Sequence, residues 1–224
     1  PAKTWAEFEP WWRYAKHTGY AQALRIAIRD LYGISELSEA AVPKIDAAIS
    51  AANRPGIYQR VLKEKARIRY GVVDDYWRPN PVRPDAAFFV LARKMDGFCS
   101  AAKAGDIRRM EEVTGIAIPD VRGLKRALEK RLAQSVEAGM VTLKTTLAYS
   151  RPLRFEEVSE AEAQADFELL MREPQRTAPR RLSDHMMHHV LQLAQDGRLP
   201  IQVHTGLQAG NGNMLDNSRP GQLN

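Results

Sequence analysis

Residues 199–213 read LPIQVHTGLQAGNGN, a short apolar run followed by a loop rich in Gly and Asn. The run Leu199–Val203 follows a helical pattern and the turn Asp196-Gly197-Arg198, so it predicts a buried strand. His204 ends that strand, and the glycines after it let the backbone approach a ligand closely. Because α/β folds place their chemistry at the carboxyl ends of strands, His204 is a candidate ligand-binding residue. The competing interpretation is a strand-end His that hydrogen-bonds a neighbouring loop.

Three further apolar runs predict strands, and helical patterns lie between the four. The predicted strands before His204 are 68–73, 87–92 and 140–146, and the predicted helices are 98–113, 120–138, 159–172 and 181–195. Strands separated by helical segments of this length indicate parallel βα units. Two architectures remain open at this point, half of a (β/α)8 barrel and a small doubly wound sheet.

The first 64 residues carry only helical patterns. Apolar side chains recur at three- and four-residue steps across 4–33, and Gly33 is placed to end a helix. Further helices are predicted after Ser38 and after the turn Pro55-Gly56. We therefore divide the chain into a helical region, 1–64, and a region of strands and helices, 65–224.

Composition sets limits on the class of protein. The chain has 224 residues, of which 44% are hydrophobic and 27% charged, as in globular domains with one sizeable core. Its net charge of +6 is dispersed without a basic stripe of interleaved aromatics, so we expect no nucleic-acid partner. No apolar run approaches the roughly 20 residues of a membrane-spanning helix, and residues 1–5 lack a signal-peptide layout. With a single cysteine, Cys99, we expect a cytoplasmic protein without membrane association or an internal disulfide.

Lys144 lies inside the apolar strand 140–146, where an unpaired ammonium is costly. Either Lys144 reaches the site as an electrostatic or substrate-binding group, or it pairs with a buried carboxylate. Asp75 and Arg93 end two other strands, and Tyr149 and Arg151 extend the strand of Lys144. Arg suits bidentate capture of a carboxylate, so we expect these four residues to line a substrate site.

His185 and His189 are four residues apart and could share a metal from one helix face. Met186 stands where the metalloprotease motif needs its Glu base, and it belongs to the buried stripe of that helix. We therefore favour a structural role for these histidines over a metal site.

The run LPIQVHTGLQAGNGN, with HHVLQLAQDGR before it and NSRPGQL after it, resembles the fifth-strand region of the amidohydrolase superfamily. The branch it resembles most is the one with uronate isomerases, metal-dependent decarboxylases and amidohydrolase 2 proteins. The resemblance implies a (β/α)8 TIM barrel of which this chain carries strands two to five. Residues 1–64 would then be a helical insertion between the first and second strands. No His-x-His pair, which the family has on its first strand, occurs in the chain, so we expect it in a strand before Pro1.

The same resemblance implies residue roles and a reaction class. His204 would be a metal ligand, Lys144 an active-site group, and Arg93, in VLARKMDGF, a substrate group. We expect a metal-dependent hydrolase of a small, carboxylate-bearing substrate, with zinc as its divalent metal and manganese as the alternative. A decarboxylase or sugar-acid isomerase on the same fold is one alternative, and a metal-free binding or regulatory barrel is another. Homo-oligomerisation is left open.

Overall fold

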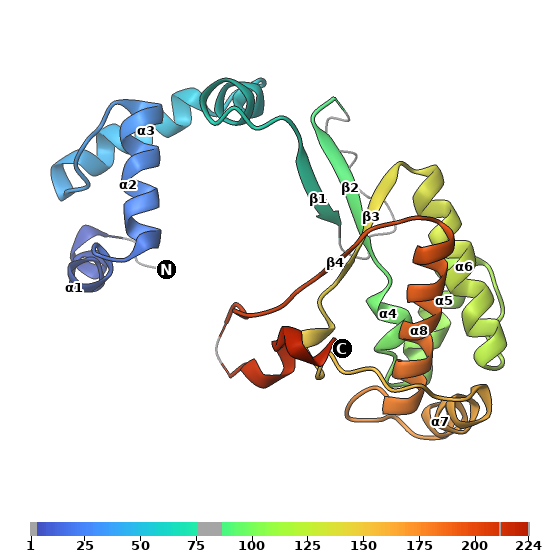
Figure 1. Cartoon of the computed structure of the whole chain (residues 1–224). Helices are drawn as coiled ribbons and strands as arrows, with labels where there is room; N and C mark the ends of the chain where they lie inside the picture. The colour runs from blue at the N-terminus through green and yellow to red at the C-terminus, as the bar shows by residue number, and fades with distance from the viewer. Residues whose placement is uncertain (1–3, 76–86, 211, 224) are drawn as a thin grey trace. The chain divides into compact units, whose positions relative to one another are not determined.

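The computed structural model describes residues 4–75, 87–210 and 212–223, except for the side chain of Asp75. The chain forms two compact units, Pro1–Arg69 and Tyr70–Asn224 (Figure 1). The division expected from the sequence, 1–64 and 65–224, stays a prediction. We describe each unit by itself.

The first unit is helical. Its elements are α1 (Trp5–Ala15), α2 (Gly19–Tyr32), a 3-10 turn η1 (Glu39–Ala41), α3 (Val42–Ala52) and a π-helix η2 (Gln59–Lys65). The helical pattern across 4–33 forms two helices because Thr18 caps the second, its Oγ1 accepting from the Ala21 amide at 3.3 Å. Gly33 ends α2 with a φ of 72°, which confirms its predicted role as C-cap.

The second unit holds a four-stranded parallel sheet. Its strands are β1 (Gly71–Asp75), β2 (Phe89–Lys94), β3 (Met140–Thr145) and β4 (Ile201–Val203). They lie in chain order, β1-β2-β3-β4, and every neighbouring pair is parallel. A doubly wound sheet reverses its strand order at a switch point, and the described strands contain none. The sheet is therefore a curled half-barrel, one of the two architectures that the sequence leaves open (Figure 1).

Strand boundaries differ from the prediction where helix ends extend further along the chain. The Ile68 amide donates to the Leu62 carbonyl at 2.8 Å, so β1 begins at Gly71 and not at Ile68. In the same way, the Leu199 amide donates to the Ala194 carbonyl at 2.8 Å, and β4 begins at Ile201. β2 begins and ends two residues later than expected, while β3 begins at the predicted residue and ends one earlier.

In the described residues of this unit, three α-helices lie between β2 and β3 and two lie between β3 and β4. They are α4 (Asp96–Cys99), α5 (Ala104–Thr114), α6 (Val121–Glu137), α7 (Glu160–Arg172) and α8 (Arg180–Asp196), with 3-10 turns η3 (Leu147–Tyr149), η4 (Leu215–Ser218) and η5 (Pro220–Gln222). The predicted helix 98–113 is interrupted because Asp106 caps α5, its Oδ2 accepting from the Ala102 and Lys103 amides. Ser159 and Glu162 form a capping box at the start of α7.

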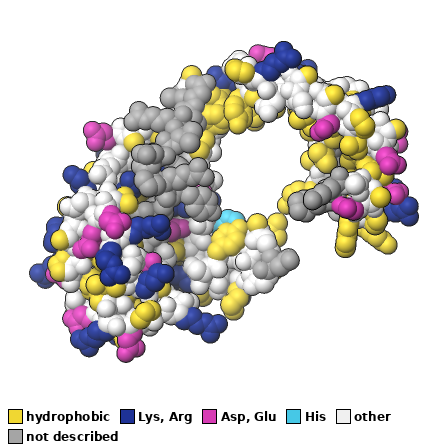
Figure 2. Space-filling model, turned by 180° about the vertical axis from the view of Figure 1, so that it is seen from behind, with side chains coloured by type: hydrophobic (Ala, Val, Ile, Leu, Met, Phe, Trp, Pro, Cys, Tyr) yellow, Lys and Arg dark blue, Asp and Glu magenta, His cyan; other side chains and the backbone are white. Residues whose placement is uncertain are grey.

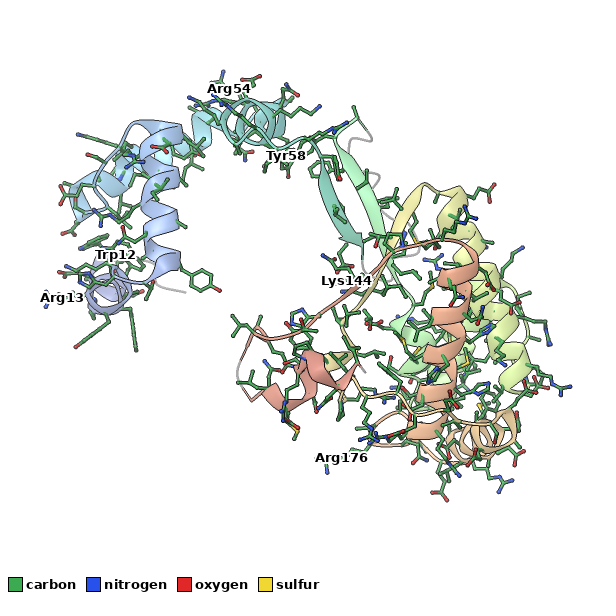
Figure 3. The ribbon with its side chains drawn as sticks, in the orientation of Figure 1. Trp12, Arg13, Arg54, Tyr58, Lys144 and Arg176 are labelled. Atoms are coloured by element: carbon green, nitrogen blue, oxygen red, sulfur yellow. The ribbon has the colours of Figure 1, made fainter. Side chains whose placement is uncertain are left out.

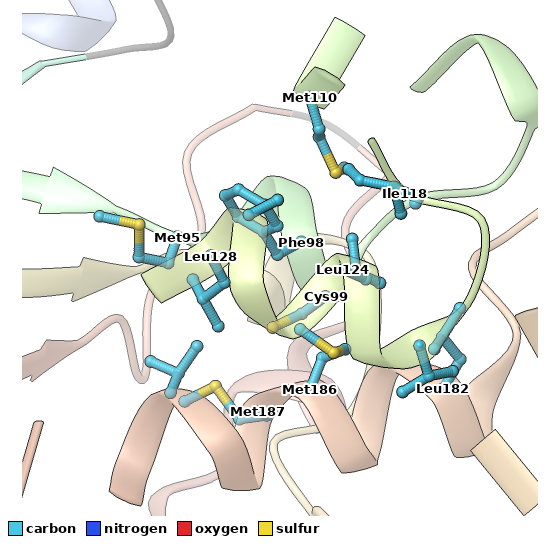
Figure 4. Packing of buried hydrophobic residues seen from close by; sticks show 14 of the residues in the cluster. Met95, Phe98, Cys99, Met110, Ile118, Leu124, Leu128, Leu182, Met186 and Met187 are labelled. Carbon is cyan, nitrogen blue, oxygen red and sulfur yellow. The ribbon is translucent and has the colours of Figure 1, made fainter. Parts of the chain in front are cut away.

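The two faces of the sheet differ in chemistry. Leu143 is 2% exposed and joins a core with Phe98, Leu128 and Met186 from α4, α6 and α8 (Figure 4). The register pairs Leu143 with Ile201, so both side chains lie on this helix-covered face. Successive strand residues point to opposite faces, and the other side, which we term the polar face, carries Asp74, Lys94, Lys144 and Gln202.

Two surface properties bear on partners. No helix of the described residues combines the length and apolar character needed to cross a bilayer. On the side of the molecule in Figure 2, Lys and Arg side chains are interspersed with Asp and Glu and form no continuous stripe.

Candidate functional site

The polar face brings three charged side chains onto adjacent strands. Lys94 of β2 is paired in register with Lys144 of β3, and Lys144 is paired in turn with Gln202 of β4. The Lys94 ammonium lies 2.8 Å from the Asp74 carboxylate, and only 6% of the Lys94 side chain is exposed. An ion pair of this kind satisfies a charge that would otherwise be costly to bury.

Lys144 differs from its neighbour. Its side chain is half-buried, and within residues 4–74, 87–210 and 212–223 it has no carboxylate partner. Figure 3 shows Lys144 on the side of the sheet opposite helices α5, α6 and α8. The ammonium is thus a charge available to a ligand on the polar face.

His204 directly follows β4 and is held there by its backbone and its ring. Its amide donates to the Thr145 carbonyl at 3.0 Å, and its Nε2 lies 2.9 Å from the Leu207 carbonyl. A carbonyl oxygen only accepts, so Nε2 carries the proton and the neutral ring keeps its lone pair on Nδ1. This second hydrogen bond orients the ring as in metal-ligating histidines.

Tyr149 lies beside His204, with the two ring centroids 4.9 Å apart. The Tyr149 hydroxyl accepts from the Ala209 amide at 3.0 Å, and Gln208 donates to the Ala148 carbonyl at 2.6 Å. These contacts fix the Gly-rich loop after β4 against the end of β3. Of the predicted site residues, the structure thus brings His204 and Tyr149 together. His204 is two residues beyond Gln202 in the chain, and Tyr149 is five residues beyond Lys144.

Arg151 and Arg93 lie elsewhere. Arg151 donates to Ser183 Oγ at 2.7 Å and to the Asp184 carboxylate, so it joins the loop after β3 to helix α8. Arg93 is 6% exposed and is paired in register with Leu143, which places it on the helix-covered face. Asp75 ends β1 as expected, and its side chain lies outside the described residues.

Asp96 is a half-buried group that the sequence analysis does not single out. Its Oδ2 accepts from the Thr146 amide at 2.7 Å and from Thr146 Oγ1 at 3.0 Å, which joins the end of β2 to the end of β3. Burial raises the pKa of the Asp96 carboxyl, although these hydrogen bonds and the charge of Lys94 oppose the shift. Asp96 stands four residues after the end of the predicted strand 87–92, in KMDGF, and this place near a strand end is the available signal.

The histidines of α8 make structural contacts. His185 Nδ1 lies 2.8 Å from the Val158 carbonyl, and His189 Nε2 lies 3.0 Å from Glu129 Oε1. The pKa of His189 is lowered, chiefly by burial. Nowhere in the described ranges do three His, Cys, Asp or Glu side chains gather as a metal site would require.

Comparison with protein-family models and with curated protein sequences gives no match. Solved structures do resemble the chain. A protein from Lactobacillus casei ATCC 334 with the provisional name metal-dependent hydrolase aligns with a TM-score of 0.66 at 16% identity, over 94% of this chain and 53% of its own. Glucuronate isomerase from Caulobacter crescentus gives 0.71 at 17% identity, over 95% and 48%. Uronate isomerase from Thermotoga maritima gives 0.68 at 15%, over 90% and 47%.

These likenesses show the fold. All three proteins are about twice as long as the aligned region, so this chain spans about half the length of the structures it resembles. The four parallel strands in chain order agree with part of a TIM-barrel wall.

Proposed function

We propose that the protein is a metal-dependent enzyme, with hydrolysis of a small, carboxylate-bearing substrate as its leading reaction. The names of the structural neighbours, a metal-dependent hydrolase and two uronate isomerases, support an enzyme on this fold. TIM-barrel enzymes place their sites at the carboxyl ends of the strands, and Lys144, Tyr149 and His204 lie at or just beyond those ends.

The observation that carries the proposal is the difference between two neighbouring lysines. Asp74 pairs with Lys94, whereas Lys144 beside it has no carboxylate partner in the described ranges. Substrate carboxylate is the natural partner for such a half-buried ammonium, because a charge-assisted hydrogen bond offsets its partial desolvation. Lys144 then acts as a substrate-binding and electrostatic group.

His204 fits one position in a metal's coordination shell. The proton on Nε2 leaves Nδ1 as the ligand atom, and contact with Tyr149 limits rotation of the ring. One His does not hold a metal, so further ligands would have to come from outside the described residues. Zinc is our first choice and manganese the second. A bound metal would lower the pKa of a water or polarise a substrate carbonyl.

We propose the four remaining predicted site residues as substrate contacts, and their positions favour this role to different degrees. Tyr149 is best placed, beside His204 and 40% exposed. Asp75 at the end of β1 also stays a proposed substrate contact. Arg93 and Arg151 could reach a substrate at the polar face only by leaving the positions described above, so they are the weakest of the four.

A second reaction class shares the same site. Two of the three structural neighbours are uronate isomerases, and fold alone does not choose between hydrolysis, decarboxylation and sugar-acid isomerisation. An unpaired Lys144 suits the carboxylate of a sugar acid as well as that of a hydrolase substrate. Assays should therefore include uronates beside carboxylate-bearing esters and amides.

Metal binding tests the role of His204. The protein is loaded with Zn²⁺ or Mn²⁺, dialysed and analysed for bound metal, together with His204→Ala and the control His17→Ala. His17 is exposed in the first unit, so it reports adventitious binding by a surface His. We expect metal loss in His204→Ala alone. Equal retention by all three proteins would refute a metal at His204 and favour a metal-free binding domain.

Activity tests the role of Lys144. In Lys144→Ala we expect loss of turnover with most of the metal retained, because Lys144 contacts substrate and not metal in this proposal. Lys144→Arg should restore part of the substrate affinity, since it keeps the positive charge. Full activity of Lys144→Ala on every active substrate would remove Lys144 from the site.

A further inference from the structure

A cavity of about 400 Å³ lies on the second unit beside the loops that follow β2 and β3. We term it the arginine cavity, and its polar lining comprises Ser100, Ser150, Arg151, Arg176, Thr177 and Arg180. Its apolar lining includes Cys99 and Leu147, which are 2% and 3% exposed. The Gln175 amide donates to the Ala102 carbonyl at 2.7 Å, which ties the α7–α8 loop to the loop after α4.

Charge in the arginine cavity is unbalanced. Three arginines line it, and among the described residues no Asp or Glu does. The buried Asp184 behind the lining serves two of them, since it binds Arg151 and lies 3.7 Å from Arg180. Arg176 is exposed and has no ion-pair partner among the side chains of residues 4–74, 87–210 and 212–223. Figure 3 shows it on the loop between α7 and α8, at a distance from Lys144.

The N-terminus of helix α8 does not account for the positive charge of the arginine cavity. Arg180 begins α8, but the amides of Arg181 and Leu182 already donate to the Asp166 carboxylate. A carboxylate therefore caps the helix from the other side. The positive charge of the cavity therefore belongs to the three arginines that line it.

Guanidinium groups bind phosphate and carboxylate through paired N–H donors, which an ammonium cannot reproduce. The Thr177 and Ser150 hydroxyls add further polar groups to the same wall. A volume of about 400 Å³ lies in the range of small-molecule sites and exceeds what an inorganic ion fills. The apolar floor at Cys99 and Leu147 suits the organic body of such a ligand.

We propose that the arginine cavity binds a small organic molecule with an oxyanion headgroup, phosphate or carboxylate. Arg176 and Arg180 would contact the headgroup, while Arg151, already held by Asp184 and Ser183, would fix the wall between them. The cavity shares only Arg151 with the predicted substrate residues, so this site stands apart from the proposed function at Lys144 and His204.

Isothermal titration of the full chain with phenyl phosphate, benzoate and benzyl alcohol tests the proposal. The three probes share one ring, and only the first two carry an oxyanion. We expect saturable one-to-one binding of at least one anionic probe and none of the alcohol, and the stronger anion identifies the headgroup. Binding of the alcohol equal to that of both anions, or saturable binding of none of the three, would overturn the proposal.

Variants locate the bound probe. Arg176→Gln removes an exposed side chain without an ion-pair partner, so the fold should be kept and affinity should fall about tenfold or more. The double variant R176Q/R180Q should abolish binding. The matched control Arg126→Gln removes an exposed charge from α6, outside the cavity, and should change affinity less than twofold.

Two results would contradict this location. Equal weakening by Arg126→Gln and Arg176→Gln would show unspecific attraction to a basic protein. Loss of binding in Lys144→Ala with full binding in Arg176→Gln would place the anion on the polar face. That second outcome would support the proposed function while it removes the arginine cavity, so the two proposals fail separately.

Discussion

The helix-covered face and the polar face of the half-barrel are built from alternate residues of the same strands. On β3, Leu143 joins the core, and the next residue, Lys144, lies on the other side with Lys94 and Gln202. One face holds the fold together through apolar packing, while the other presents charges that packing does not need. A shift of one residue in the chain thus separates the apolar core from the proposed site.

The largest effect on the free energy of unfolding is expected for Asp184, a buried residue of helix α8. This side chain is buried and binds Arg151, so Asp184→Ala leaves a largely buried guanidinium without its carboxylate. Breaking such a pair from one side costs about 3–5 kcal/mol of unfolding free energy. Urea denaturation measures it, with Asp196→Ala at the exposed end of α8 as the control. A cost below about 1 kcal/mol would mean that Arg151 finds another partner.

Leu143→Ala is the next test. It removes a buried side chain from the core beside Phe98 and should cost about 2–5 kcal/mol in the same measurement. Its matched control is the neighbouring Lys144→Ala, for which we expect a change within about 0.5 kcal/mol. Equal losses of unfolding free energy in the two variants would contradict the distinction between the two faces of the sheet.

A smaller effect is expected for Asp96, and only in how the free energy of unfolding depends on pH. Burial raises the pKa of Asp96, so the folded state favours the protonated carboxyl. The stability from this group is complete below its ordinary pKa and is lost as the pH rises through the raised one. Asp96→Asn keeps an acceptor for Thr146 without titrating. As the pH rises above the ordinary pKa of an Asp, the free energy of unfolding should therefore fall more steeply in the natural chain than in the variant. Parallel curves would contradict the shift.

The smallest change in stability should come from Lys94→Met with Asp74→Asn. Each single substitution leaves one charge without its partner on the polar face, whereas the double variant removes both. We expect the double variant to be closer in stability to the natural chain than Lys94→Met alone. A double variant less stable than both singles would show that the pair holds the strands together.

Much of the fold could be predicted because strands and helices leave local patterns. The starts and ends of α7 and β3 follow from Ser159, Glu162 and the apolar run at Met140. Strand order does not follow, since no local pattern says which strands pair. The register irregularity between Leu91 and Ala92 also has no local signal, yet it decides which residues of β2 face which side.

The positions of the candidate-site residues along the chain could be predicted better than their ion-pair partners. His204 and Tyr149 follow strands, and that placement was readable. The partner of Arg151 is Asp184, on a helix that no sequence spacing connects to it, and so Arg151 was read as a substrate group. Lys94 was overlooked beside Arg93 because alternation alone does not say which of two adjacent charges faces the core.

The order of the strands has a consequence for how the sheet is made during synthesis. Each of β2, β3 and β4 pairs with the strand that precedes it in the chain. Ribosomes add on the order of 5–20 residues per second, and domains form as their segments emerge. When β3 leaves the ribosome, its partner β2 has already been made, and the same holds for β4. This part of the sheet can thus grow at one edge, strand by strand, without any edge waiting for a distant segment of the described chain.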